Sequence, residues 1–271
     1  MTGKSFDRGR GELTRLLGPL AELMATAGGK ILEIAKGELG TRKKTDHSPV
    51  TAADVASEEI LRAGLAQLLP GTPFIAEESV ARGEIPEPGM EFLLIDPLDG
   101  TREFVAGRDE YAVNVGLISN GAPVLGAIYA PASHIIYAGS DGAAFRAPLV
   151  PGAHFDPQNV VAIRARARPQ KLVAAVSRSY LDKASEAFLS TLPIEGRLVL
   201  GSSLKFSRLA EGAADVYPRL TSISEWDVAA GHALLVAAGG RVESANGGQL
   251  RYGKKDKGFR LEAFVAWGAN A

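Results

Sequence analysis

The chain has 271 residues, of which 46% are hydrophobic and 23% are charged, a composition typical of soluble globular proteins. Because 30 Lys and Arg oppose 31 Asp and Glu, no overall positive charge favours a nucleic acid polymer, and the absence of cysteine excludes disulfides, thiolate metal sites and cysteine nucleophiles. The sequence has neither a signal-like N-terminus nor an apolar run near the roughly 18 residues of a membrane span, so we expect a cytoplasmic protein without a transmembrane segment.

In the first half of the chain, two helices precede a largely antiparallel sheet. Apolar residues at helical spacing predict a helix from Leu13 to Ile34, and a second helix runs from Asp54 to Leu69, before the Pro70-Gly71 turn. Short apolar runs predict two buried strands, and the Asn120-Gly121 pair predicts a hairpin. The strands are expected at 74–76 and 92–95, and the hairpin at 111–129.

The second half reads as alternating strands and helices. Breaker residues between Pro148 and Gln158 mark a boundary, so we predict two domains, 1–155 and 156–271. The predicted strands lie at 172–176, 197–200, 215–217 and 264–266, and the predicted helices at 183–192, 203–211 and 227–238. This alternation indicates a mixed α/β fold.

Acidic residues follow apolar strands at two places. The run at 74–76 leads into Glu77, and the run at 92–95 leads into Asp96-Pro97-Leu98-Asp99-Gly100-Thr101. Because α/β proteins bind ligands at the carboxyl ends of strands, we expect these carboxylates to share a crevice. A third acidic segment begins the helix that ends at Gly239-Gly240, and it places Asp227 in the first helical turn, facing the sheet.

These carboxylates predict a magnesium site. Carboxylates crowded in one crevice repel each other unless hard cations neutralise them, and Mg²⁺ is the usual cation where substrates carry phosphates. Pro97 fixes the chain so that Asp96 and Asp99 turn to the same side, which leaves the Leu98 carbonyl as a further oxygen ligand. The hydroxyl of Thr101 could orient a metal-bound water.

Each acidic segment also has a purely structural interpretation. Asp-Pro-x-Asp-Gly is typical of a type I turn, and Glu77-Glu78 fits a solvated loop edge. Asp227 fits a charge that complements a helix dipole, which is worth about 0.3–1 kcal/mol. The coincidence of all three segments with the expected crevice favours a site.

Basic and hydroxyl-bearing segments predict where an anionic substrate binds. Gly201-Ser202-Ser203 precedes a helix, so its backbone N–H groups are expected to face an anion, with Lys205 in the first turn. Ser177-Arg178-Ser179 closes a predicted strand, and Lys44 lies in the polar segment before Asp54. For any single Lys or Arg, an ordinary surface position is the alternative.

The motifs resemble those of the inositol monophosphatase-like, lithium-sensitive metal phosphatases, over essentially the whole chain. The resemblance rests on Ala76-Glu77-Glu78, the segment 96–101, and Trp226-Asp227 followed by Gly231 and Gly239-Gly240. The segments 50–54, 177–179, 201–206 and 217–219 are similar to those of CysQ-type 3'(2'),5'-bisphosphate nucleotidases. Relatives often show a histidine after Ser-Arg-Ser. Here the residue is Tyr180, so a stacking or hydroxyl contact is expected instead.

The resemblance implies a layered α-β-α-β-α sandwich with two or three Mg²⁺ ions. The implied metal ligands are Glu77, Asp96, Asp99, Asp227 and the Leu98 carbonyl. Glu77 and Thr101 would orient the attacking water, and Asp54 would hydrogen-bond Thr101. The residues expected to contact substrate are Lys44, Leu98, Asp99, Gly100, Thr101, Ser177, Arg178, Ser179, Tyr180, Ser202, Ser203, Lys205 and Asp227.

The implied reaction is hydrolysis of a small phosphorylated molecule. The first choice of substrate is 3'-phosphoadenosine 5'-phosphate, split to AMP and phosphate in sulfate assimilation and nucleotide recycling. The alternative is an inositol-phosphate or sugar-phosphate phosphatase on the same scaffold. A catalytically silent nucleotide-binding regulator would be expected to lack a metal carboxylate or Thr101. Oligomeric state, with a homodimer as one option, and contact with a membrane surface stay open.

Overall fold

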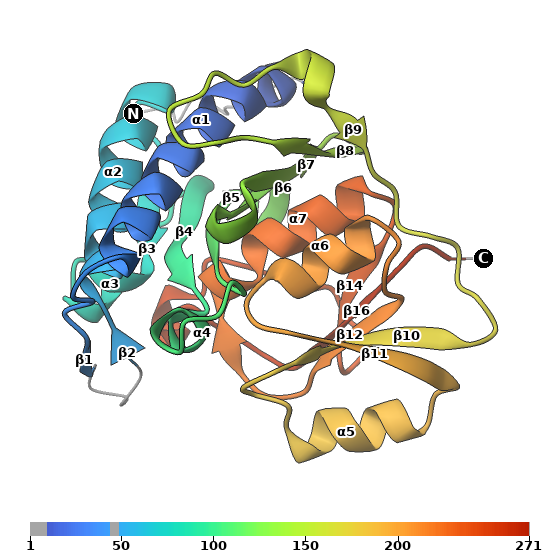
Figure 1. Ribbon diagram of the computed structural model, residues 1–271. Helices are drawn as coiled ribbons and strands as arrows, with labels where there is room; N and C mark the ends of the chain where they lie inside the picture. The colour runs from blue at the N-terminus through green and yellow to red at the C-terminus, as the bar shows by residue number, and fades with distance from the viewer. Residues whose placement is uncertain (1–9, 44–48, 271) are drawn as a thin grey trace.

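The computed structural model describes residues 10–43 and 49–270. In this part of the chain, layers of helices alternate with layers of sheet, five layers in all (Figure 1). α1 (Arg10–Ala35) and α2 (Ala52–Leu68) form the outer layer on a seven-stranded sheet. Apolar residues at helical spacing, among them Leu17, Met24 and Ile31, bury one face of α1.

The remaining layers come from the second half of the chain. α6 (Leu204–Ala210) and α7 (Ala229–Ala237) lie between the seven-stranded sheet and a five-stranded sheet, whose outer face carries α5 (Lys183–Ser190). The layered α-β-α-β-α fold expected from the sequence is therefore confirmed. The division into domains at residue 155 stays a prediction.

The seven-stranded sheet is antiparallel except for the β3–β4 pair, and its strand order follows the chain. Its strands are β3 (Phe74–Ala76), β4 (Glu91–Asp99), β5 (Ala112–Ser119), β6 (Ala122–Ala130), β7 (Ile135–Ser140), β8 (Ala143–Pro148) and β9 (Val161–Ala162). The hairpin formed by β5 and β6 was predicted, whereas β7 and β8 were not.

The five-stranded sheet is mixed, with the order β11-β10-β12-β16-β14. Its strands are β10 (Leu172–Ser177), β11 (Ile194–Leu200), β12 (Val216–Arg219), β14 (Arg241–Ser244) and β16 (Phe264–Trp267). The small elements are β1 (Arg42–Lys43), β2 (Pro49–Val50), β13 (Ile223–Ser224), β15 (Arg260–Leu261), α3 (Glu77–Ala81), α4 (Thr101–Val105), and the 3-10 turns η1 (Pro131–Ser133), η2 (Pro157–Asn159), η3 (Glu225–Asp227) and η4 (Lys255–Lys257).

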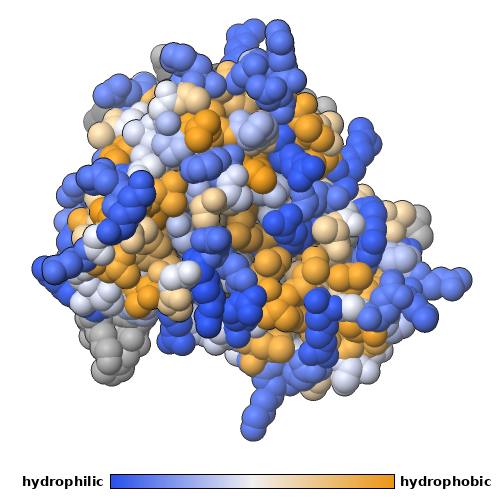
Figure 2. Space-filling view, viewed as in Figure 1, coloured by the Kyte–Doolittle hydropathy of each residue, from blue (hydrophilic) through white to orange (hydrophobic). Residues whose placement is uncertain are grey.

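Three apolar cores join the five layers. Met24, Leu65 and Leu93 belong to the core under α1 and α2. Phe206 and Leu234 belong to the core between the sheets, and a smaller core under α5 includes Leu189. On the outside, hydrophobic side chains alternate with hydrophilic ones over the face seen in Figure 2.

Glycines on three neighbouring strands determine how closely α7 packs on the first sheet. Gly116, Gly126 and Gly139 stand opposite one another across β5, β6 and β7. A Cβ atom added at Gly126 would lie 2.1 Å from the carbonyl oxygen of Ala230 in α7. The absence of side chains at these three positions therefore lets the α7 backbone approach the sheet. In the described part of the chain, no helix has the length and apolar character needed to cross a bilayer.

Candidate active site

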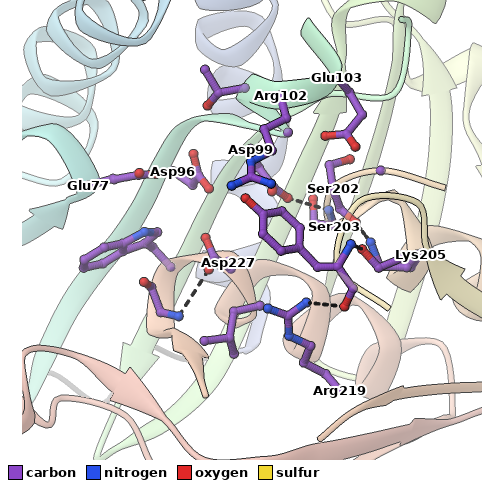
Figure 3. A pocket seen from close by; sticks show the side chains of 18 of the residues that line it. Glu77, Asp96, Asp99, Arg102, Glu103, Ser202, Ser203, Lys205, Arg219 and Asp227 are labelled. Atoms are coloured by element: carbon purple, nitrogen blue, oxygen red, sulfur yellow. Dashed lines mark hydrogen bonds between the residues drawn. The ribbon is translucent and has the colours of Figure 1, made fainter. Parts of the chain in front are cut away.

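Three carboxylates from separate segments meet in a cavity of about 290 Å³. Strand register explains the first pair, because Ala76 lies opposite Ile95 in the parallel β3–β4 ladder and Glu77 and Asp96 are the next residues. Asp227 ends η3 and is separated from α7 by Val228, rather than lying in the first turn of that helix as expected. One carboxylate oxygen from each of the three lies within 4.8 Å of the others (Figure 3).

Burial and mutual repulsion make this cluster unfavourable without a cation. Burial raises the pKa of Asp227 to about 7, with further contributions from the charges of Asp99 and Glu77. Burial also raises the pKa of Asp96 well above its usual value, and the charge of Glu77 adds to this shift. Oxygen ligands in this number and proximity fit a hard divalent cation, so the cluster could hold a metal ion.

The segment from Asp96 to Asp99 leaves the regular ladder between β4 and β5, where the register shifts. Asp96 Oδ1 accepts a hydrogen bond from the Leu98 N–H at 3.0 Å, and the Pro97 carbonyl accepts one from Ser57 Oγ at 2.8 Å. Asp99 turns toward the second half of the molecule. Its Oδ2 atom accepts hydrogen bonds from the Ser203 N–H and from Asn114 Nδ2.

Thr101 is tied to Asp54 by a hydrogen bond. Asp54 is buried in the first turn of α2, where its Oδ2 accepts from the backbone N–H and the hydroxyl of Thr51, at 2.7 and 2.6 Å. Its Oδ1 accepts from Thr101 Oγ1 at 3.2 Å, and the Leu98 carbonyl lies 3.1 Å from the same hydroxyl. A hydroxyl has one proton and two lone pairs, so Thr101 keeps acceptor capacity for a partner in the cavity.

Among the described residues, four cationic side chains line the same cavity. They are Arg102, Lys205, Arg219 and Arg260. None of these four forms an ion pair with a carboxylate of the described residues. Lys205 is only 3% exposed, and burial lowers its pKa to about 8 against the opposing charge of Asp99. Figure 3 shows Lys205 and Arg219 across the cavity from Glu77 and Asp96.

Tyr180 lies among these cations. The guanidinium carbons of Arg102 and Arg219 lie over its ring, 4.5 and 5.4 Å from the centroid, and the Tyr180 carbonyl accepts a hydrogen bond from Arg219 Nη1 at 3.3 Å. The Nε atom of Arg219 is buried, and no residue within 10–43 or 49–270 forms a hydrogen bond with it. Buried donors are normally hydrogen-bonded, so a partnerless guanidinium nitrogen on a cavity-lining residue fits a site that takes up an anion.

Most residues expected from the sequence to form the site do line this cavity. They are Glu77, Asp96, Leu98, Asp99, Gly100, Thr101, Ser177, Tyr180, Ser202, Ser203, Lys205 and Asp227. Asp54 lies behind Thr101, and Lys44 lies outside the described residues. In contrast to expectation, Arg178 and Ser179 do not line the cavity, because their side chains bind Glu110 and Glu103.

The Gly201-Ser202-Ser203 turn also differs from its expected role. Its N–H groups were expected to be free for an anion, but the Gly201 N–H donates to Glu110 Oε2 at 2.8 Å and the Ser203 N–H donates to Asp99. The turn is therefore held by carboxylates at both ends. Sequence reasoning missed Arg102, Arg219 and Arg260 as cavity residues. Arg219 ends β12, so its position at a strand end was the available signal.

The comparisons with known proteins agree with this architecture. The model of the inositol monophosphatase family matches residues 12–263, and the chain belongs to this family. Among curated relatives, 3'(2'),5'-bisphosphate nucleotidase CysQ of Escherichia coli (strain K12) is 35% identical over 255 residues, which cover 92% of this chain and 100% of that protein. The CysQ protein of Salmonella typhimurium is 36% identical over the same shares of the two chains.

Solved structures give the same result for the fold. CysQ from Bacteroides thetaiotaomicron superposes with a TM-score of 0.79 at 30% identity, covering 97% of this chain and 99% of that one. An inositol monophosphatase from Anabaena superposes with a TM-score of 0.73 at 26% identity, covering 95% and 92%. The sequence-based assignment to the inositol monophosphatase family is thus confirmed.

Proposed function

We propose that this chain is a Mg²⁺-dependent 3'(2'),5'-bisphosphate nucleotidase that hydrolyses 3'-phosphoadenosine 5'-phosphate to AMP and phosphate. Its relatives with this name span 92% of the chain at 35–36% identity, and the acidic cluster offers the oxygen ligands that Mg²⁺ prefers. Such a reaction would serve sulfate assimilation and nucleotide recycling.

The observation that carries the proposal is the division of one cavity into an acidic and a cationic side. Glu77, Asp96 and Asp227 lie at one side, where metal ions would hold the phosphate that is cleaved. Lys205 and Arg219 lie at the other side, without a carboxylate partner of their own in the described part of the chain. A monophosphate has no group for the second side, whereas a bisphosphate supplies charge for both.

The residues themselves would orient water and substrate. Bound Mg²⁺ would supply Lewis-acid activation of water and stabilisation of the leaving oxygen. Glu77, Asp96, Asp99, Asp227 and the Leu98 carbonyl would hold the ions. Because both carboxylate oxygens of Asp54 accept hydrogen bonds, the Thr101 proton points toward Asp54 and away from the cavity. The Thr101 lone pairs would then accept a hydrogen bond from the attacking water and orient it.

The alternative, an inositol-phosphate or sugar-phosphate phosphatase, keeps the same acidic side. Inositol 1-phosphate supplies no second phosphate for the cationic side, whereas fructose 1,6-bisphosphate supplies one without a nucleoside. A phosphate-release assay on adenosine 3',5'-bisphosphate, inositol 1-phosphate and fructose 1,6-bisphosphate separates the three. We expect the highest kcat/KM for the adenosine bisphosphate, with AMP as the product, and loss of release in chelating buffer. A higher kcat/KM for either of the other substrates would refute the nucleotidase assignment.

A further inference from the structure

The ion pair between Arg178 and Glu110 joins the two halves of the chain beside the cavity. Nε and Nη2 of Arg178 donate to the two oxygens of Glu110 at 2.7 and 2.6 Å, and Nη2 also donates to the Val199 carbonyl at 3.0 Å. The residues are 68 positions apart in the sequence. The charge of Arg178 is therefore matched by a carboxylate rather than directed at a ligand.

Glu110 also contacts the turn that lines the cavity. Its Oε2 atom accepts a hydrogen bond from the Gly201 N–H at 2.8 Å. The backbones are equally close, because a Cβ atom added at Gly201 would lie 2.5 Å from the Glu110 carbonyl oxygen and 2.7 Å from Glu103 Cγ. Both the side chain and the backbone of Glu110 thus fix the beginning of the turn.

The other end of the same turn is held independently. Ser203 donates its N–H to Asp99 and its hydroxyl to Asn114 Oδ1, the latter at 2.7 Å. Asn114 Nδ2 in turn donates to Asp99 Oδ2 at 3.1 Å. Loss of the Glu110 contact would free Gly201 and Ser202, while Ser203 and Asp99 would keep their partners.

We propose that Glu110, held by two hydrogen bonds from Arg178, is a positioning residue that keeps Gly201 and Ser202 in place for substrate binding. The pair is partly exposed, with side-chain exposures of 36% and 22%, and solvent-screened pairs of this kind add little to stability. Its main effect is on position, since Ser202 lines the cavity and its carbonyl accepts a hydrogen bond from Lys205 Nζ. This role rests on the proposed function.

The test uses Glu110→Gln, Arg178→Gln and the double variant. We expect each single change to raise the KM for adenosine 3',5'-bisphosphate by about 5–20-fold and to leave kcat within about twofold, because the turn moves and the metal ligands do not. The KM of the double variant should not exceed the higher of the two single-variant KM values, since both changes remove one shared contact. If Arg178→Gln raised KM and Glu110→Gln did not, Arg178 would contact substrate directly and the positioning role of Glu110 would be wrong.

Glu186 and Arg197 supply a matched control. They form an ion pair with two bonds of 2.9 and 2.7 Å between α5 and β11, and neither residue lines the cavity. Glu186→Gln should keep both kinetic constants, and equal KM values for Glu110→Gln and Glu186→Gln would overturn the proposal. So would a loss of Tm in Glu110→Gln far beyond that in Glu186→Gln.

A binding measurement separates this inference from the proposed function. Calorimetric titration of wild type and variants with adenosine 3',5'-bisphosphate in chelating buffer, where no hydrolysis is expected, should show the same 5–20-fold weakening as a change in Kd. Absence of phosphate release by the wild-type chain would refute the nucleotidase assignment. The Kd values would still decide the role of Glu110, with unchanged binding in Glu110→Gln counting against it.

Discussion

Asp54 and Thr101 are 47 residues apart in the chain, and their side chains are joined by a hydrogen bond of 3.2 Å behind the carboxylate cluster. Each partner in this hydrogen bond is positioned by the first turn of a helix. Asp54 lies in the first turn of α2, where it forms a capping box with Thr51, and Thr101 is the first residue of α4. Local helix capping thereby fixes the orientation of a hydroxyl at the cavity wall.

A pair of substitutions at Thr101 tests that orientation. Thr101→Val removes the hydroxyl at nearly constant volume, and we expect kcat to fall by roughly 10²–10⁴-fold because an attacking water would lose its acceptor. Thr101→Ser keeps the hydroxyl and should retain most of the turnover. The comparison needs kcat for both variants on the adenosine bisphosphate, and equal kcat values would exclude a role for the hydroxyl.

Asp96→Asn should separate folding from turnover. Replacing a carboxylate of the cluster by a neutral amide weakens a hard-cation ligand, so we expect at least about a 100-fold loss of kcat/KM together with weaker Mg²⁺ binding by calorimetry. Circular dichroism should stay unchanged. Asp256→Asn, at an exposed residue away from the cavity, is the control. Wild-type turnover in metal-free chelating buffer would contradict the metal requirement.

Much of the fold and of the acidic side could be predicted because those signals are local. Asp96 and Glu77 directly follow apolar strands, and periodicity defined the long helices. β7 and β8 were missed even though Asp141-Gly142, with φ values of 53° and 78°, is a typical hairpin pair. The role of Arg178 could not be predicted, because the carboxylate that binds it lies far away in the sequence.

The cationic side of the cavity should determine selectivity for a second phosphate. Arg219→Gln removes a charge next to Tyr180 and a buried Nε donor that has no partner among the described residues. We expect kcat/KM for the adenosine bisphosphate to fall about 10–150-fold, equivalent to 1.5–3 kcal/mol for a charge-assisted contact, and that for inositol 1-phosphate to change little. An equal loss on both substrates would instead point to a defect shared with the metal site.

His232 in α7 should make the stability of the protein depend on pH. Burial lowers its pKa to about 4, and its Nδ1 atom lies 2.9 Å from the Tyr252 hydroxyl. As the pH falls below 6.5, His232 takes up a proton in the unfolded chain but not in the folded chain. The free energy of unfolding is therefore highest above pH 6.5 and falls by roughly 3 kcal/mol as the pH approaches 4.

Urea unfolding of wild type and His232→Gln at pH 5 and 7 measures this effect of His232. The variant should lose less stability between these pH values, and identical losses would show that His232 is protonated in the folded state.

The last prediction concerns the packing of α7 on the first sheet, which sets the place of Asp227. A Cβ atom at residue 126 would lie 2.1 Å from the Ala230 carbonyl and 2.9 Å from Ala233 Cβ, so Gly126→Ala must push α7 away. Overpacking of this kind costs about 1–3 kcal/mol. Because only Val228 separates Asp227 from α7, the same shift should also weaken Mg²⁺ binding. Gly248→Ala is the control, since no atom of a described residue beyond its two chain neighbours lies within 4 Å of a Cβ there. Urea unfolding and Mg²⁺ calorimetry on the two variants are the measurements. A destabilised Gly126→Ala protein with wild-type Mg²⁺ affinity would show that η3 holds Asp227 independently of the helix.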